Sequence, residues 1–218
     1  MAFVLATLGH SRGHGECLVS LLTDEETRDL ILDDEKLLHA LLEHHGCLRV
    51  STHFYFYVLV RQVFRRSGIE GRAVADYVAE VLAEFSQQEQ LRCELPGGGG
   101  PADYFFELMA ALQTADDRTG VLLRAHIGNQ SLFLAGVFPE RIRARAERRG
   151  APGLSYYEAL GRTNFQMASD HPLARSHGLA PIYATLAERF QTTCRALNDL
   201  SERLVNLGEP EPPAHLLA

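Results

Sequence analysis

The fold is decided by residues 179–207, which read LAPIYATLAERFQTTCRALNDLSERLVNL. Large apolar side chains recur there in steps of three and four residues, the spacing that places one stripe on one face of an α-helix. The stripe consists of Leu179, Tyr183, Leu186, Phe190, Leu197, Leu200, Leu204 and Leu207, with Thr193 in the one gap. Pro181 suits a first helical turn, and Gly208 followed by Pro210 ends the helix. The pattern predicts one uninterrupted C-terminal helix whose apolar stripe other segments must cover.

The segments that precede this helix repeat the helical spacing. Residues 70–85 place valine, leucine and aromatic side chains on one stripe, whereas residues 119–137 are apolar on two opposite sides. A helix of the second kind is usually sandwiched between neighbours, and its Gly128 and Gly136 leave room for another backbone to approach. We therefore predict an all-α fold, a multi-helix bundle of about eight helices around the long C-terminal helix.

The most apolar segment, residues 53–64, fits two kinds of secondary structure. Its first part, HFYFYVLV, is rich in aromatic and β-branched residues and taken alone could be a buried strand. The continuation favours a helix, because the apolar residues keep helical spacing and Gly68 follows as a stop. In that helix four polar residues fall on the side that we expect to face outward: Arg61, Gln62, Arg65 and Arg66.

Composition divides the chain into three parts. Residues 1–22 place two apolar patches around a turn rich in glycine and histidine, which predicts a poorly ordered N-terminal segment. Residues 23–207 predict a single all-α helical domain with a Gly-rich loop at 96–101, the best candidate for a hinge. Residues 208–218 predict an extended Pro-rich tail.

Charge and cysteine content argue against several classes of protein. The formal net charge of -7 argues against general nucleic-acid binding, which needs a basic surface. No stretch has the eighteen or so uncharged apolar residues of a membrane span, and the first apolar run lacks the basic residues of a signal peptide. The 4 cysteines are scattered, which does not suggest a disulfide framework. We therefore expect a cytoplasmic protein with no nucleic-acid partner and no membrane association.

A cluster of histidine and cysteine residues raises the possibility of a metal site. His44, His45, Cys47 and His53 lie close together in the sequence and offer the nitrogen and sulfur ligands that zinc prefers. His45 and Cys47 can form a ligand pair on a short turn, with His53 at the start of the next helix. The alternative is structural, because a histidine near a helix C-terminus is stabilised by the helix dipole without any metal. No second ligand pair follows at zinc-finger spacing, so zinc is the only cofactor that the sequence raises.

The predicted helix over 119–137 carries polar residues between its two apolar sides. His126, Asn129 and Gln130 form a polar row on a helix that otherwise looks buried, and buried polar groups need hydrogen-bond partners. Either the row lines a small-molecule pocket between helices, or it belongs to a structural network with Tyr157, Asn164 or Thr193. A second polar row on the same helix contains Arg124 and Ser131.

The segment after Pro139 predicts a short, strongly basic helix. Four of its arginines, Arg141, Arg145, Arg148 and Arg149, are candidates for binding a partner, because guanidinium groups fit carboxylate geometry. With a negative net charge, an acidic protein surface, including that of a second copy of this chain, fits better than nucleic acid. The alternative is a solvated helix without a partner, in a chain whose only lysine is Lys36 and whose basic residues are otherwise arginines.

These features lead to two hypotheses about function. The first is a non-catalytic interaction or regulatory module that self-associates as a homo-oligomer, since the sequence shows no phosphate loop and no GxSxG nucleophile motif. The second is a small-ligand-binding or metal-assisted helical-bundle enzyme with a site lined by the helix over 121–137. The sequence nominates no catalytic residue.

Overall fold

The computed structural model describes residues 24–43, 51–86, 93–94, 101–102 and 105–208. This part of the chain is predominantly helical, which confirms the prediction of an all-α protein. Its helices are α3 (Glu25–Leu32), α4 (Glu35–Glu43), α5 (Thr52–Arg66), α6 (Arg72–Phe85), α7 (Phe105–Thr114), α8 (Asp117–Val137), α9 (Pro139–Arg149), α10 (Leu154–Ser169), α11 (Pro172–Ser176), α12 (Ala180–Glu188) and α13 (Phe190–Gly208). A short antiparallel ladder pairs β1 (Cys93–Glu94) with β2 (Pro101–Ala102).

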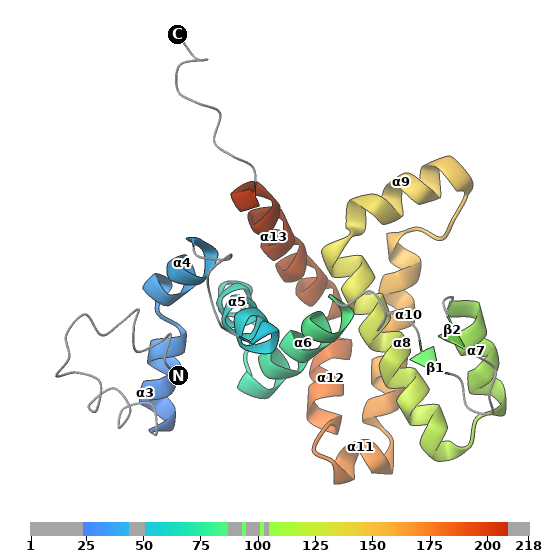
Figure 1. Ribbon diagram of the computed structural model, residues 1–218. Coiled ribbons are helices and arrows are strands. Elements are labelled where there is room, and N and C mark those ends of the chain that lie inside the picture. The colour runs from blue at the N-terminus through green and yellow to red at the C-terminus, as the bar shows by residue number, and fades with distance from the viewer. Residues whose placement is uncertain (1–23, 44–50, 87–92, 95–100, 103–104, 209–218) are drawn as a thin grey trace.

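Figure 1 shows the order in which the helices pack. The α3 and α4 helices lie at one side, followed by α5 and α6, then α12 and α13, then α8 and α10, with α7 at the opposite side. The most extensive pairing is that of α8 with α10, and α13 contacts both α8 and α5. The α9 helix follows α8 and projects from the end of the α8–α10 pair.

Side-chain caps explain where several of these helices begin and end. The Ser51 hydroxyl accepts a hydrogen bond from the Phe54 N–H at 3.2 Å and so opens α5 as a helix rather than a strand. The Asp116 carboxylate likewise accepts from the Thr119 N–H at 2.6 Å and starts α8. At the other end of α9, Gly150 has a φ of 61°, the left-handed conformation that closes a helix without a Cβ clash.

The prediction of one uninterrupted C-terminal helix is wrong, because α12 and α13 are separate helices that meet at Arg189. Arg189 has φ −100° and ψ 17° and ends α12. The Thr193 hydroxyl and backbone N–H both donate to the Arg189 carbonyl, at 3.0 and 2.8 Å. The same kind of bond from the Thr185 hydroxyl to the Pro181 carbonyl leaves α12 unbroken, so the threonine does not account for the interruption. The interruption lies in the backbone of Arg189, whose ψ is far from the helical value of about −42°.

The apolar stripe itself is buried on both sides of the break. Tyr183 and Leu186 of α12 are 5% and 0% exposed, and Phe190 and Leu197 of α13 are each 1% exposed. The side-chain pattern was therefore predicted correctly although the helix was not. The break and the five-residue α11 helix each add one helix to the count, which is 11 in the described chain where the sequence predicted about eight.

The buried apolar side chains form one main cluster and two smaller ones. The main cluster takes residues from α4, α5, α6, α8 and α10–α13. A second cluster joins α3, α4 and α5 and consists of Leu32, Leu37, Leu41 and Val58. The third lies between α7 and α8 and consists of Leu108, Leu123 and Ile127.

The α8 helix lies between the main cluster and the third one. Its Val121 and Leu132 belong to the main cluster, whereas its Leu123 and Ile127 pack against α7. This arrangement confirms that a helix apolar on two opposite sides is sandwiched between neighbours. A Cβ added at Gly128 would lie 2.8 Å from the Phe165 ring of α10, so the close approach of α8 and α10 depends on glycine.

Several expectations lie outside the described residues. They are the poorly ordered segment at 1–22, most of the Gly-rich loop at 96–101 and the Pro-rich tail beyond Gly208. Of the loop, Pro101 is described and pairs with Glu94 in the two-stranded ladder. No helix in the described ranges is long and apolar enough to cross a membrane.

The closest helix approach predicts the effect of one added methyl group. A Cβ at Gly161 of α10 would lie 2.8 Å from the Ser131 Cβ and closer still to the Phe190 ring. We expect Gly161→Ala to lower the free energy of unfolding by about 1–3 kcal/mol, as overpacked cores do. Gly120→Ala is the matched control, because its Cβ would meet only Leu112 at 3.9 Å. That change should stabilise the helix by up to about 1 kcal/mol. Urea unfolding checks both, and equal stabilities for the two variants would contradict this packing.

Candidate functional site

The structure describes only one of the four predicted zinc ligands. His44, His45 and Cys47 lie outside the described residues, and His53 lies in the first turn of α5. The His53 Nε2 atom is 3.3 Å from Asp76 Oδ1 and 3.4 Å from Glu80 Oε2, two partly exposed carboxylates of α6. Within the described ranges, no group of three His, Cys, Asp or Glu side chains could hold a metal ion. The zinc site therefore stays a prediction. In the structure, His53 contacts the carboxylates of Asp76 and Glu80.

The polar row on α8 faces α6. Asn129 Oδ1 accepts a hydrogen bond from the Tyr77 hydroxyl at 2.8 Å, and the Tyr77 ring packs edge-on against Tyr183 of α12 at 5.5 Å. The His126 ring packs edge-on against Phe85 of α6 at 5.7 Å. Asn129 therefore pairs with Tyr77, not with the partners that the sequence suggested. Burial raises the pKa of Tyr77 well above its ordinary value, so its hydroxyl stays protonated and donates.

The rest of the row is largely buried. Gln130 is 4% exposed, and His126 Nε2 is buried with no hydrogen-bond partner in the part of the chain that the structure describes. The clefts at α5–α6 and at α7–α8–α10 are not lined by His126, Asn129 or Gln130. The hydrogen bond from Tyr77 places Asn129 in a structural contact, and the small-molecule pocket stays a prediction.

The four candidate arginines of α9 are all exposed: Arg141, Arg145, Arg148 and Arg149. Only Pro139 and Ile142 of this helix are buried, and Arg143 forms an ion pair with Glu140 one turn earlier. The helix thus presents its guanidinium groups to solvent, where an acidic surface could reach them.

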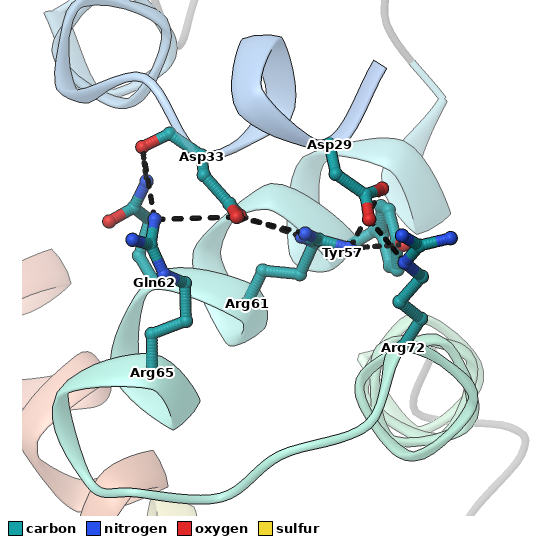
Figure 2. Close-up of polar contacts among 7 residues, drawn as sticks. All are labelled: Asp29, Asp33, Tyr57, Arg61, Gln62, Arg65 and Arg72. Carbon is teal, nitrogen blue, oxygen red and sulfur yellow. Dashed lines mark hydrogen bonds and ion pairs between the residues drawn. The ribbon is translucent and has the colours of Figure 1, made fainter. Parts of the chain in front are cut away.

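Sequence reasoning placed Arg61 and Gln62 on the outward side of α5, and this prediction is wrong. Arg61 is 7% and Gln62 5% exposed, because the junction of α3 and α4 covers that side of α5. Figure 2 shows Asp29, on α3, and Asp33, at the junction, reaching toward Arg61. A helical wheel gives the direction of a side chain but not whether another helix covers it.

The contacts of Arg61 form what we call the Asp–Arg network (Asp29, Asp33, Tyr57, Arg61 and Arg72). Asp33 accepts two hydrogen bonds from the Arg61 guanidinium, from Nε at 2.8 Å and from Nη2 at 3.0 Å. Arg61 Nη1 donates to the Tyr57 hydroxyl at 3.1 Å and to Asp29 Oδ1 at 3.4 Å. Arg72 of α6 forms an ion pair with Asp29. The hydrogen bonds that Arg61 donates to the Asp33 carboxylate raise the pKa of Arg61, so the guanidinium stays charged.

A cleft of about 400 Å³ adjoins this network, and both arginines and carboxylates line it. Arg61, Arg65 and Arg72 line it, which by itself would suggest an anion site. Arg65 Nη1 lies 3.3 Å from Asp33 Oδ2, however, and Glu70 also lines the cleft. With carboxylates facing the guanidinium groups, little attraction remains for a phosphate or a sulfate. We therefore assign the network a structural role, the attachment of α3 to α5 and α6.

A second cleft, of about 540 Å³, lies between α7, α8 and α10, and we call it the groove. Its lining is mostly apolar and consists of Met109, Leu112, Gln113, Arg124, Tyr156, Ala159, Leu160, Thr163, Asn164 and Met167. Met109, Tyr156 and Met167 are 37%, 44% and 49% exposed. The chain has 3 methionines, and apart from Met1 both of them line this groove. Because methionine side chains adapt to many shapes, they are over-used at binding surfaces.

One charged side chain lines the mostly apolar groove. Arg124 of α8 is partly buried, and its Nη1 atom lies 3.4 Å from Asn164 Oδ1 and 2.8 Å from Met167 Sδ. No carboxylate in the described ranges lies within ion-pair distance of Arg124, in contrast to Arg61. A partly desolvated guanidinium without a counter-ion is unfavourable unless a partner supplies one. The groove is therefore the strongest candidate for a binding site.

The sequence contained a weak signal for this site. It placed Arg124 on a polar row of the helix over 119–137, but it favoured the other row, His126 to Gln130. Met109 and Met167 lie on helices far apart in the sequence, so no local pattern joins them to Arg124. Only the packing of α7 and α10 on either side of Arg124 creates the groove.

Removing one partner of the Asp–Arg network is expected to be costly. Asp33→Asn leaves the guanidinium of Arg61, 8% exposed, without its main counter-ion, and we expect a loss of about 3 kcal/mol in the free energy of unfolding. Glu35→Gln is the matched control, since Glu35 pairs with Arg66 at 3.2 Å on the surface. Its effect should stay below about 1 kcal/mol. Urea unfolding of both variants checks this difference, and equal losses would refute the structural role.

The burial of His126 predicts a pH dependence of stability. Burial lowers the pKa of His126 below its ordinary value of 6.5, so the unfolded chain takes up the proton more readily than the folded one. The stability that follows from this difference in pKa is fully present above pH 6.5 and is lost as the pH falls below that value. In His126→Gln, unfolding free energy should fall less than in wild type between about pH 7.5 and about pH 5.5. The exposed His177, changed to Gln, is the control, and a wild-type slope in His126→Gln would contradict the prediction.

Comparison with known proteins supplies no analogy for this site. No protein-family model, curated protein or solved structure shows significant similarity to the chain. The function must therefore be inferred from the geometry and chemistry of the groove alone.

Proposed function

We propose that this protein is a non-catalytic interaction module that binds an amphipathic helix of a partner protein in the groove between α7, α8 and α10. The observation that supports the proposal is the exposure of Met109, Tyr156 and Met167 around one mostly apolar groove. Large apolar side chains at the surface are common singly, but their concentration along a groove marks an interaction site.

The shape of the groove favours a helix over a small molecule. Small-molecule sites enclose most of their ligand, whereas this groove is an open depression bordered by α7 on one side and by α10 on the other. A helix binds such a groove with apolar residues three and four positions apart.

Three further properties belong to this proposal. The helices pack as one bundle about the α12–α13 segment, the protein works in the cytoplasm, and it self-associates. The exposed arginines of α9, in a chain with a net charge of -7, support contact with an acidic surface of a second copy. Light scattering of the purified chain tests self-association, and a strict monomer would remove this part of the proposal.

A pair of alanine-to-tryptophan changes tests whether the groove binds helices. Amphipathic peptides of about sixteen residues are selected on the wild-type protein from a displayed library. Ala159→Trp adds a large ring to the groove, whereas Ala184→Trp adds the same ring to an exposed position of α12. We expect Ala159→Trp to weaken binding of the selected peptides at least about tenfold, because the added ring occupies their place. Ala184→Trp should bind as wild type does.

Fluorescence anisotropy with labelled peptides measures both affinities. Equal binding by wild type and Ala159→Trp would show that the groove is not the site. Circular dichroism of both variants verifies that they remain folded, so that a loss of binding can be assigned to the groove.

A further inference from the structure

Arg124 has hydrogen-bonding capacity that the described residues do not use. A guanidinium carries five N–H donors in a planar fork, and in Arg124 only Nη1 has partners, Asn164 Oδ1 and Met167 Sδ. The Nε and Nη2 atoms donate to no group in the described ranges. Neither an amide oxygen nor a thioether sulfur neutralises the positive charge, so the floor of the groove keeps both free donors and an uncompensated charge.

The neighbourhood of Arg124 restrains the position of its fork. Asn164 holds one side of it and is itself oriented, because its Nδ2 donates to the Leu160 carbonyl of α10 at 2.9 Å. Asn164 is 2% exposed, so this support lies beneath the groove surface. A guanidinium restrained in this way loses less conformational entropy on binding than a free surface arginine. The remaining donors, Nε and Nη2, can bind a pair of oxygen atoms, such as the two oxygens of a carboxylate.

Taking the proposed function as its basis, we propose that Arg124 determines specificity in the groove by binding a carboxylate of the partner helix. The partner is then an amphipathic helix with an Asp or Glu flanked by apolar residues three or four positions away. The apolar residues pack on Met109, Tyr156 and Met167, and the carboxylate accepts hydrogen bonds from the Arg124 fork. A helix with an amide or a lysine at that position leaves Arg124 without a counter-ion or repels it, which excludes wrong partners.

The test compares an acidic peptide with its amide counterpart. A peptide selected on the wild-type protein is synthesised with its Asp or Glu and again with Asn or Gln at that position. Each form is titrated against wild type, Arg124→Met and Arg124→Lys. Arg195→Met is the matched control, since Arg195 is exposed on α13 and its loss changes the net charge equally.

We expect the amide form to bind at least about tenfold more weakly than the acid to wild type and to Arg195→Met, as for the loss of a charged hydrogen bond. On Arg124→Met the two forms should bind alike, because the coupling between carboxylate and guanidinium is gone. Arg124→Lys should keep part of the preference, since it retains the charge but not the fork. Arg124→Lys also keeps the test decisive if Arg124→Met fails to fold.

The outcomes separate this inference from the proposed function. If selected peptides are blocked by Ala159→Trp but show no Arg124-dependent preference for the acid, the groove binds helices and the role of Arg124 is refuted. If no selected peptide is blocked by Ala159→Trp, the proposed function fails and this inference fails with it. If dodecanoate instead raises the melting temperature of wild type but not of Arg124→Met while no peptide binds, the groove is a small-molecule site and the helix is refuted.

Discussion

The packing of the helices depends on α8, because this helix is apolar on two opposite faces and both must be covered. Its Val121 and Leu132 require the main core, and its Leu123 and Ile127 require a second neighbour, which α7 supplies. The α7 helix has 10 residues and α8 has 21, so α7 covers only part of the second face. The groove lies where α7, α8 and α10 meet beside that partial cover. A packing requirement of one helix thus creates the surface on which the function is proposed.

Two arginines illustrate how the surroundings of a charge decide its role. Arg61 is buried with two carboxylates and a tyrosine hydroxyl around it, and its charge is used within the fold. Arg124 is partly buried with only an amide oxygen and a thioether sulfur as partners. Desolvation disfavours both guanidinium groups, but only the first is compensated by the protein itself. The contrast between them is the physical reason for assigning structure to one cleft and binding to the other.

The N-terminal helices are attached differently from the rest. The α3 and α4 helices share a small apolar cluster with α5, while the Asp–Arg network supplies directional contacts from Asp29 and Asp33 to α5 and α6. A small cluster leaves the relative orientation of two helices loosely specified, because apolar contacts have little directionality. The two-point bond between Asp33 and Arg61 has a defined geometry, and so it fixes where α3 lies on α5.

Local patterns by themselves determined most helices and their apolar faces. The stripe from Tyr183 to Leu200 and the two-sided burial of α8 follow from side-chain spacing, which depends only on neighbours within two turns. Tertiary structure alone decided the burial of Arg61, the pairing of Asn129 with Tyr77 and the groove around Arg124. Each of these three features joins helices distant in sequence, so periodicity shows where a side chain points but not which residues it contacts. The break at Arg189 is a change of backbone conformation at a single residue, with a ψ of 17°. The spacing of the apolar side chains does not reveal it, because Tyr183, Leu186, Phe190 and Leu197 are buried on both sides of the break.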